Sequence, residues 1–129
     1  MPATVIPSVL IVDEDRPAAE LVRAVLSPHY SCAIAGSLAE ALELLKERKF
    51  DLLLVNRELP DGEGPTLIAV LKTISPQTGA FVLSERVDEE TMTEAIEAGA
   101  LEFIRKPVNL IRLLNLMESA IAFNESSAA

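Results

Sequence analysis

The stretch DLLLVNRELPDGEG, residues 51 to 64, joins an apolar run to a polar turn. Four apolar residues in a row lead to Asn56, and a Pro-Asp-Gly turn follows at positions 60–62. A short apolar run bounded by turn residues is typical of a strand that other elements cover on both faces. The stretch therefore predicts a central strand of a parallel sheet, with Asn56 where the strand leaves the core.

The same alternation of short apolar runs and helical spacing extends outward in both directions. We expect further strands at 9–13, 31–36, 79–84 and 100–106. Helices are expected at 16–26, 65–74, 88–99 and 109–123, and a capping box at Ser37 and Glu40 begins one more. Five strand–helix repeats predict an α/β, doubly wound (βα)5 sandwich of three layers. The expected order of its five-stranded parallel sheet is 2-1-3-4-5, as in flavodoxin-like folds.

Length and composition fit one folded domain. The chain has 129 residues, and 50% of them are hydrophobic, which is enough for a single core. We expect the domain at 1–123, followed at 124–129 by a disordered tail or the start of a linker. The N-terminal apolar run is too short for a membrane span and lacks the basic residues that begin a signal peptide. The lone Cys32 cannot form an internal disulfide, so we expect a reducing, cytoplasmic setting.

The chain is strongly acidic. It has 20 Asp and Glu residues against 11 Lys and Arg residues, which gives a formal net charge of −9. Such a surface repels nucleic-acid phosphates and anionic lipid head groups. Direct binding to nucleic acid or to a membrane is therefore not expected.

Polar residues follow four of the expected strands. Asp13 and Glu14 follow the first, Asn56 ends the third, Ser84 ends the fourth and Lys106 follows the fifth. In a doubly wound sheet the carboxyl ends of the strands form the functional crevice, so these side chains should meet there. Carboxylate, amide and backbone oxygens suit Mg²⁺, while a Lys and a hydroxyl suit a phosphoryl group or another small anion.

Each of these residues also has an ordinary structural explanation. An acidic turn after a strand often begins a solvated helix, a terminal Ser is often without a role, and a Lys before Pro is usually a surface residue. The interpretation as a site rests on their combination at one edge of the sheet.

The chain resembles the receiver domain of response regulators in bacterial-type two-component (phosphorelay) signal transduction. The matching segments are VLIVDED, DLLLVNRELPDGEG, FVLSER and GALEFIRKPV, in the order and spacing of that family. The resemblance implies a cytoplasmic signalling module and not an enzyme. It also implies a histidine kinase or a phosphotransfer protein as partner, and a linked output domain or a downstream protein.

The resemblance assigns roles to individual positions. Asp13 and Glu14 would bind Mg²⁺, together with the residue at the phosphoacceptor position, Asn56, and the backbone carbonyl of Glu58. Ser84 and Lys106 would contact the phosphoryl group. Two further positions are the aromatic switch residue, Phe103, and a proline that is usually preceded by a cis peptide bond, Pro107.

Two positions depart from the family pattern. The nucleophilic Asp of receivers is replaced by Asn56, whose amide oxygen is a weak nucleophile and forms no stable acyl phosphate. Ser84 is followed by Glu85 where the family usually has Ala or Gly, which adds bulk and negative charge in the path of a phosphodonor. We therefore expect a degenerate, phosphorylation-independent pseudo-receiver with a weakened Mg²⁺ site and no organic cofactor.

Two alternatives remain at this point. The chain is an ordinary receiver if an engineered Asp-to-Asn substitution produced Asn56. A more remote alternative is a flavodoxin-like enzyme that binds a nucleotide or a flavin. Such enzymes need a Gly- or Ser/Thr-rich phosphate loop after the first strand, where this chain has DEDRP.

A protein-contact face is expected on the last two helices and the fifth strand. The apolar residues of the last helix spread over more of its surface than one sheet face needs, and they include Ile111 and Leu116. Glu90, Glu94 and Glu97 form an acidic row on the preceding helix. Core burial and a solubilising surface are the simpler explanations, and a homodimer or a docked partner is the functional one.

Overall fold

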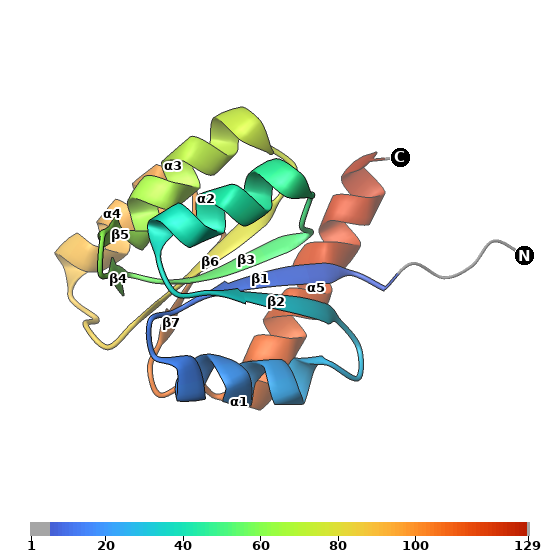
Figure 1. Cartoon of the computed structure of the whole chain (residues 1–129), viewed down its shortest axis with the longest axis horizontal. Helices are drawn as coiled ribbons and strands as arrows, with labels where there is room; N and C mark the ends of the chain where they lie inside the picture. The colour runs from blue at the N-terminus through green and yellow to red at the C-terminus, as the bar shows by residue number, and fades with distance from the viewer. Residues whose placement is uncertain (1–5, 129) are drawn as a thin grey trace, which may run out of the picture.

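The computed structural model describes the backbone of residues 6–128 and the side chains of residues 6–123. Its main sheet has five parallel strands in the order β2-β1-β3-β6-β7, which confirms the predicted order 2-1-3-4-5 (Figure 1). The five strands are β1 (Ser8–Val12), β2 (Ser31–Ala35), β3 (Leu52–Asn56), β6 (Gly79–Ser84) and β7 (Glu102–Arg105).

Helices follow the strands and cover both faces of the sheet. They are α1 (Arg16–Leu26), α2 (Leu38–Glu47), α3 (Gly64–Ile74), α4 (Glu89–Ala98) and α5 (Leu110–Ala128). Side chains cap several of these helices: Asp15 accepts from Ala18 N, and Ser37 accepts from Glu40 N as the capping box predicts. Helix α4 ends at Gly99, whose φ of 111° lies in the left-handed region that glycine adopts most easily.

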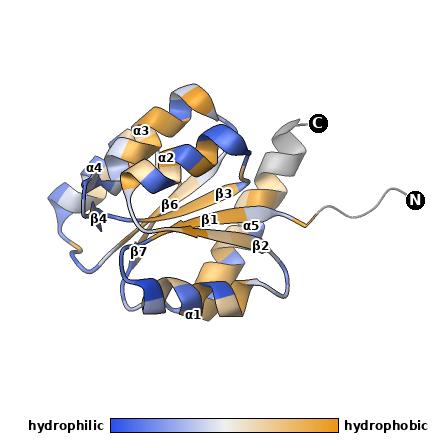
Figure 2. Ribbon diagram, in the orientation of Figure 1, coloured by the Kyte–Doolittle hydropathy of each residue, from blue (hydrophilic) through white to orange (hydrophobic). Residues whose placement is uncertain are grey.

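Two hydrophobic clusters make the three layers. Helices α1 and α5 pack on one face of the sheet, around Phe81, Leu113 and Met117. Helices α2, α3 and α4 pack on the other, and Figure 2 shows the apolar strands enclosed between the two helical layers. Burying one such large apolar side chain stabilises the fold by about 1.5–3 kcal/mol. This layering shields the central strands β1, β3 and β6 from solvent on both faces.

The central strand β3 behaves as its sequence predicts. Leu52, Leu53, Leu54 and Val55 are at most 1% exposed, and they alternate between the two clusters. Asn56 is half-buried at the carboxyl end of the strand. The two-sided burial explains the unbroken apolar run, because neither face of this strand contacts water.

Three local features differ from expectation. The turn after β3 contains a two-stranded hairpin, β4 (Glu58–Leu59) with β5 (Gly62–Glu63), which was not predicted. The first strand begins and ends one residue earlier than expected, and the fifth covers only part of 100–106. Helix α5 continues to Ala128, so the backbone at 124–128 is helical and the expected helix end at Phe123 is wrong. The division of the chain at 123 stays a prediction, and residue 129 lies outside the described residues.

A search for membrane spans gives a negative result. Within residues 6–128, none of the helices combines the length and the apolar character that crossing a bilayer requires.

Candidate functional site at the carboxyl edge of the sheet

Four neighbouring strands bring the predicted residues to one edge of the sheet. Asp13 follows β1, Asn56 ends β3, Ser84 ends β6 and Lys106 follows β7. Their backbones are directly linked across the edge, because Arg57 N donates to Leu83 O and Lys106 N donates to Ser84 O, each at 2.8 Å. The predicted convergence of these strand ends is therefore present in the structure.

An ion pair between Asp13 and Lys106 spans the edge. Lys106 Nζ lies 2.8 Å from Asp13 Oδ2, and the two side chains are only 18% and 10% exposed. The second carboxylate oxygen, Asp13 Oδ1, accepts a hydrogen bond of 2.9 Å from Asp15 N. Both oxygens of Asp13 are thus engaged within the protein.

Asn56 makes a hydrogen bond that an aspartate could not make. Its amide nitrogen, Nδ2, donates to the backbone carbonyl of Glu58 at 2.9 Å. An ionised carboxylate has only acceptors, so it would face this carbonyl without a shared proton. The amide therefore closes the turn after β3 and orients the carbonyl of Glu58 towards itself.

The remaining predicted residues differ in their surroundings. Ser84 is 5% exposed, and its Oγ accepts from Arg86 N at 3.0 Å. The peptide bond between Lys106 and Pro107 is cis, as the resemblance implied. Phe103 is half-buried and packs against the cluster beneath α2, α3 and α4. Glu14 is exposed, although Asp13 beside it is buried.

Glu85 is exposed and lines a cavity at this edge together with Asp13, Asn56 and Lys106. It pairs with neither nearby arginine. Arg86 binds the carboxylate of Asp88 through Nε at 3.0 Å and a terminal nitrogen at 2.8 Å. Among the described side chains, Glu85 therefore has no cationic partner at the opening of the site.

Arg57 is a buried residue that the sequence analysis did not identify. It is 9% exposed, and its terminal nitrogens lie 3.3 Å from Glu58, 3.5 Å from Glu94 and 4.0 Å from Glu63. The neighbouring Glu94 carboxylate is the main reason that the pKa of Glu63 is raised. Arg57 links the turn after Asn56 to helix α4. The signal in the sequence was an arginine directly after an apolar strand, with acids nearby on both sides of the turn.

Asp61 is a second residue that was missed. Its carboxylate accepts from Leu38 N at 2.8 Å and from Ala39 N at 3.0 Å, at the start of α2. These two backbone hydrogen bonds lower the pKa of Asp61. The Pro-Asp-Gly turn therefore caps a helix that lies far from it in the sequence.

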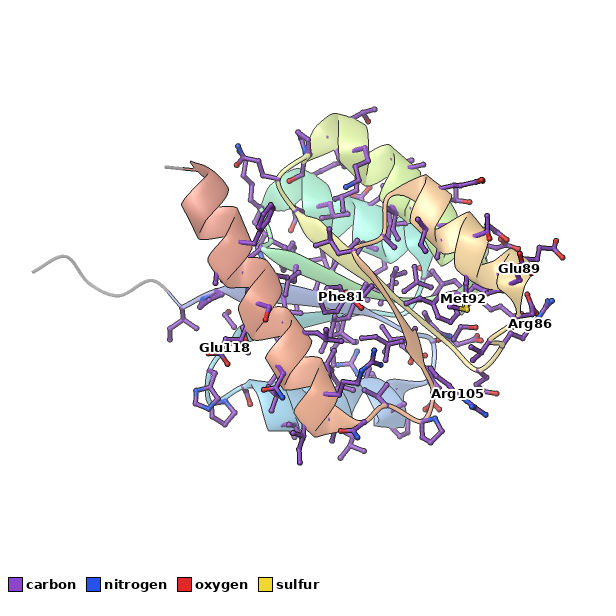
Figure 3. The ribbon with its side chains drawn as sticks, turned by 180° about the vertical axis from the view of Figure 1, so that it is seen from behind. Phe81, Arg86, Glu89, Met92, Arg105 and Glu118 are labelled. Atoms are coloured by element: carbon purple, nitrogen blue, oxygen red, sulfur yellow. The ribbon has the colours of Figure 1, made fainter. Side chains whose placement is uncertain are left out.

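The residues predicted for the contact face differ in their exposure, and their role in contacts stays a prediction. Ile111 is 75% exposed, and Glu90 and Glu97 are exposed on α4. Leu116 is half-buried and packs against the core beneath α1 and α5, so core burial describes it better than an exposed face. Glu94 contacts Arg57 and is not a free member of the acidic row. Figure 3 shows Met92, Glu89 and Arg86 together at the start of α4, away from Phe81 in the core.

Comparisons with known proteins agree with this architecture. The family described as response regulator receiver domain matches residues 9–118. The chain belongs to this family. Receiver domains are signalling modules of two-component systems that are generally non-catalytic apart from autophosphorylation.

Two curated relatives illustrate the match. Response regulator protein PilR of Pseudomonas aeruginosa is 34% identical over 120 residues, which are 92% of this chain and 27% of that protein. Transcriptional regulatory protein ZraR of Salmonella typhimurium is 30% identical over 122 residues, which are 94% of this chain and 28% of that protein. The chain thus spans little more than a quarter of the length of these relatives.

Solved structures show the same fold. A CheY-like receiver domain protein from Methanospirillum hungatei superimposes with a TM-score of 0.91 at 27% identity, covering 95% of this chain and 99% of that one. A response regulator from Burkholderia pseudomallei with a phosphorylated aspartic acid, calcium ion and citrate has a TM-score of 0.82 at 25% identity. That match covers 95% of this chain and 73% of the other.

Receiver domains typically bind Mg²⁺ at the phosphorylation site, and several of the oxygens expected to hold that ion here already accept hydrogen bonds within the chain. The carbonyl of Glu58 accepts from Asn56, and Lys106 and Asp15 occupy the oxygens of Asp13. Within the part of the chain whose side chains are described, three His, Cys, Asp or Glu side chains do not come together in a metal-binding group. A divalent cation would compete with Lys106 for Asp13, while the oxygen of Asn56 and the exposed carboxylate of Glu14 accept no hydrogen bond from the described residues.

Proposed function

We propose that this chain is a receiver-like signalling domain that does not accept a phosphoryl group and acts through protein–protein contacts. The observation that carries the proposal is the hydrogen bond from Asn56 Nδ2 to the carbonyl of Glu58. In this proposal Asn56 stands at the phosphoacceptor position of the family. An amide there provides no anionic oxygen for in-line attack on phosphorus, so no aspartyl phosphate forms.

Charge at the site supports the same function. The opening carries Asp13, Asp15 and Glu85, and the one cation among the residues lining the cavity, Lys106, is already paired with Asp13. An incoming phosphodonor is an anion and meets two carboxylates that have no cationic partner there. Without a well-bound Mg²⁺ little offsets that repulsion, so we propose that Mg²⁺ binds weakly at most.

The partners follow from the family and from the surface. A histidine kinase or phosphotransfer protein would then bind this domain without transferring a phosphoryl group to Asn56. A linked output domain or a separate downstream protein would respond to the contacts themselves. The surface we propose for these contacts, or for a homodimer, is formed by α4, β7 and α5.

An acetyl phosphate assay tests the proposed function. The chain, the Asn56→Asp variant and the Asn56→Asp/Glu85→Ala variant are incubated with acetyl phosphate and Mg²⁺, and intact mass reports the added phosphoryl group. We expect no addition to the chain itself, slow addition to Asn56→Asp and faster addition when Glu85 is also removed. Asn56→Ala serves as the matched control without a nucleophile.

Two outcomes of this assay would count against the proposal. A stable phosphoryl adduct on the unsubstituted chain, absent from Asn56→Ala, would contradict the proposal. Addition to Asn56→Asp at the same rate with and without Glu85 would contradict the role given to Glu85.

A further inference from the structure

A cavity of about 500 Å³ extends from the carboxyl edge of the sheet into the cleft between α1 and the start of α5. Its walls are mostly aliphatic and come from β1, α1, β3, β6 and the segment that leads into α5. Helix α1 provides Ala18, Leu21 and Val22, β3 provides Leu54, and the segment entering α5 provides Val108 and Leu110. Most small-molecule sites have volumes of roughly 300–1,000 Å³ and apolar walls with a few polar groups.

The cavity leaves apolar surface in contact with water. Leu21, on its wall, is 60% exposed, and Val22, Val108 and Leu110 are only half-buried. A ligand with an apolar body would remove this surface from water and gain about 25 cal/mol per Å² of it. The walls therefore favour an occupant that is largely hydrocarbon.

The charged residues at the polar end of the cavity favour a ligand with a positive charge. Lys106 and Asp13 neutralise each other in their ion pair, which leaves Asp15 and Glu85 as the uncompensated charges among the lining residues. Asp15 uses only Oδ1 to cap α1. An anionic head group would meet two carboxylates here and a lysine that is already paired.

The amide of Asn56 adds a directed acceptor at the same end. Its Nδ2 donates to Glu58, and within the described side chains its oxygen accepts no hydrogen bond. The oxygen is therefore available to an N–H donor that enters the cavity. Two carboxylates and one amide oxygen suit an ammonium or a guanidinium group.

We propose that this cavity binds a small amphipathic organic cation. Its apolar body lies between α1 and the segment entering α5, and its charged head lies against Asp15, Glu85 and the oxygen of Asn56. This inference goes beyond the proposed function and does not depend on it. The aliphatic walls and both carboxylates remain whichever residue occupies position 56.

The binding test uses three probes with the same apolar body: 4-phenylbutylamine, 4-phenylbutanol and 4-phenylbutanoate. Each is titrated into the ¹⁵N-labelled chain near neutral pH and low ionic strength, and backbone amide shifts are followed. We expect saturable shifts confined to α1 and residues 106–110, with the amine binding at least about tenfold tighter than the alcohol. Such a ratio corresponds to about 1.4 kcal/mol of head-group interaction. The carboxylate should bind more weakly than the alcohol.

Two variants separate the head group from the body. Glu85→Gln should bring the affinity for the amine down towards that for the alcohol and leave the alcohol unchanged. Leu21→Asn should weaken the amine and the alcohol alike, because it removes apolar wall. Glu85 and Leu21 are both exposed, so neither substitution disturbs the core. Glu90→Gln, on an exposed acid of α4 away from the cavity, is the matched control and should change neither affinity.

Three results would overturn the inference: equal binding of the three probes, shifts that do not saturate, or shifts centred away from α1 and residues 106–110. The phosphorylation assay is separate, since it is run without any of these probes. Uptake of a phosphoryl group by Asn56 would contradict the proposed function, but it would not change the expected preference of the cavity for a cationic ligand. Failure of the amine titration would leave the phosphorylation result unaffected.

Discussion

Two single residues define the chemistry of the edge, and each does so through one contact. Asn56 satisfies a backbone carbonyl with an N–H donor, and Lys106 neutralises Asp13. In the first contact, the amide supplies a donor that a carboxylate at this position would lack. In the second, the ammonium group of Lys106 offsets the charge of a nearly buried carboxylate.

The Asp13–Lys106 pair leads to a stability prediction. Lys106→Met should destabilise the fold by about 2 kcal/mol, because it leaves a nearly buried carboxylate without its partner. Adding Asp13→Asn to Lys106→Met should recover much of that loss. Urea denaturation of the unsubstituted chain, the two single variants and the double variant measures the coupling free energy between the two residues. Lys46→Met is the control, since that ion pair is exposed and should contribute less than about 1 kcal/mol. Purely additive effects at Asp13 and Lys106 would contradict the assignment.

At the scale of elements, acidic caps fix where helices begin. Asp61 caps α2 from the turn after β3, and Asp88 caps α4 through a 2.8 Å hydrogen bond from Thr91 N. That backbone N–H group, together with Arg86, lowers the pKa of Asp88 to about 2. The Arg57–Glu94 contact joins α4 to the same turn. The helices are therefore attached to the site edge by carboxylates as well as by the core.

The cap at α4 gives a pH prediction. Because the pKa of Asp88 is lower in the folded chain than in the unfolded one, its stabilisation is complete above the unfolded value near 3.8 and is lost as the pH falls towards 2. The thermal midpoints of the chain and of Asp88→Ala should thus differ most at pH 5–7 and converge as the solution is acidified below about pH 4. Glu97→Gln, on the exposed side of the same helix, is the control. A difference that stays constant down to pH 3 would count against this cap.

At the scale of the whole molecule, the edge strand β7 lies with α4 on one side and α5 on the other (Figure 3), and exposed apolar residues flank it. Ile96 on α4 is 62% exposed and Ile111 on α5 is 75% exposed. Acidic side chains lie on α4, while Arg105 and Arg112 lie on β7 and α5. In the proposed homodimer, a two-fold contact would place the acidic part of one copy against the basic part of the other.

Sedimentation equilibrium tests this face. If the chain forms a homodimer through α4, β7 and α5, Ile96→Ser and Ile111→Ser should each weaken association at least about tenfold, since each removes apolar area from the contact. Ile74→Ser, a 47% exposed residue on α3, is the matched control and should leave association unchanged. Leu116 is unsuitable for this test because it packs against the core. A monomer at every accessible concentration, or equal association of all variants, would exclude the homodimer.

The sequence by itself determined the layers and the positions that meet at the edge, and the strand order came from the flavodoxin-like folds that its repeats match. The layers and these positions follow from local patterns: unbroken apolar runs require strands covered on both faces, and parallel strands bring their carboxyl ends together. The family resemblance added the cis peptide bond before Pro107, which no local pattern specifies. Leu116 shows the limit of periodicity, because spacing on a helix cannot tell which neighbouring helix covers a side chain.

Only the tertiary structure determined which side chains contact each other at the carboxyl edge of the sheet. The pairing of Lys106 with Asp13 joins residues that are 93 positions apart, and the capping of α2 by Asp61 spans 23. The burial of Arg57 against Glu94 and the cavity between α1 and α5 likewise depend on how separate elements pack. Side-chain chemistry is encoded at each position, but distance, exposure and the choice among several charged partners arise only when the chain is folded.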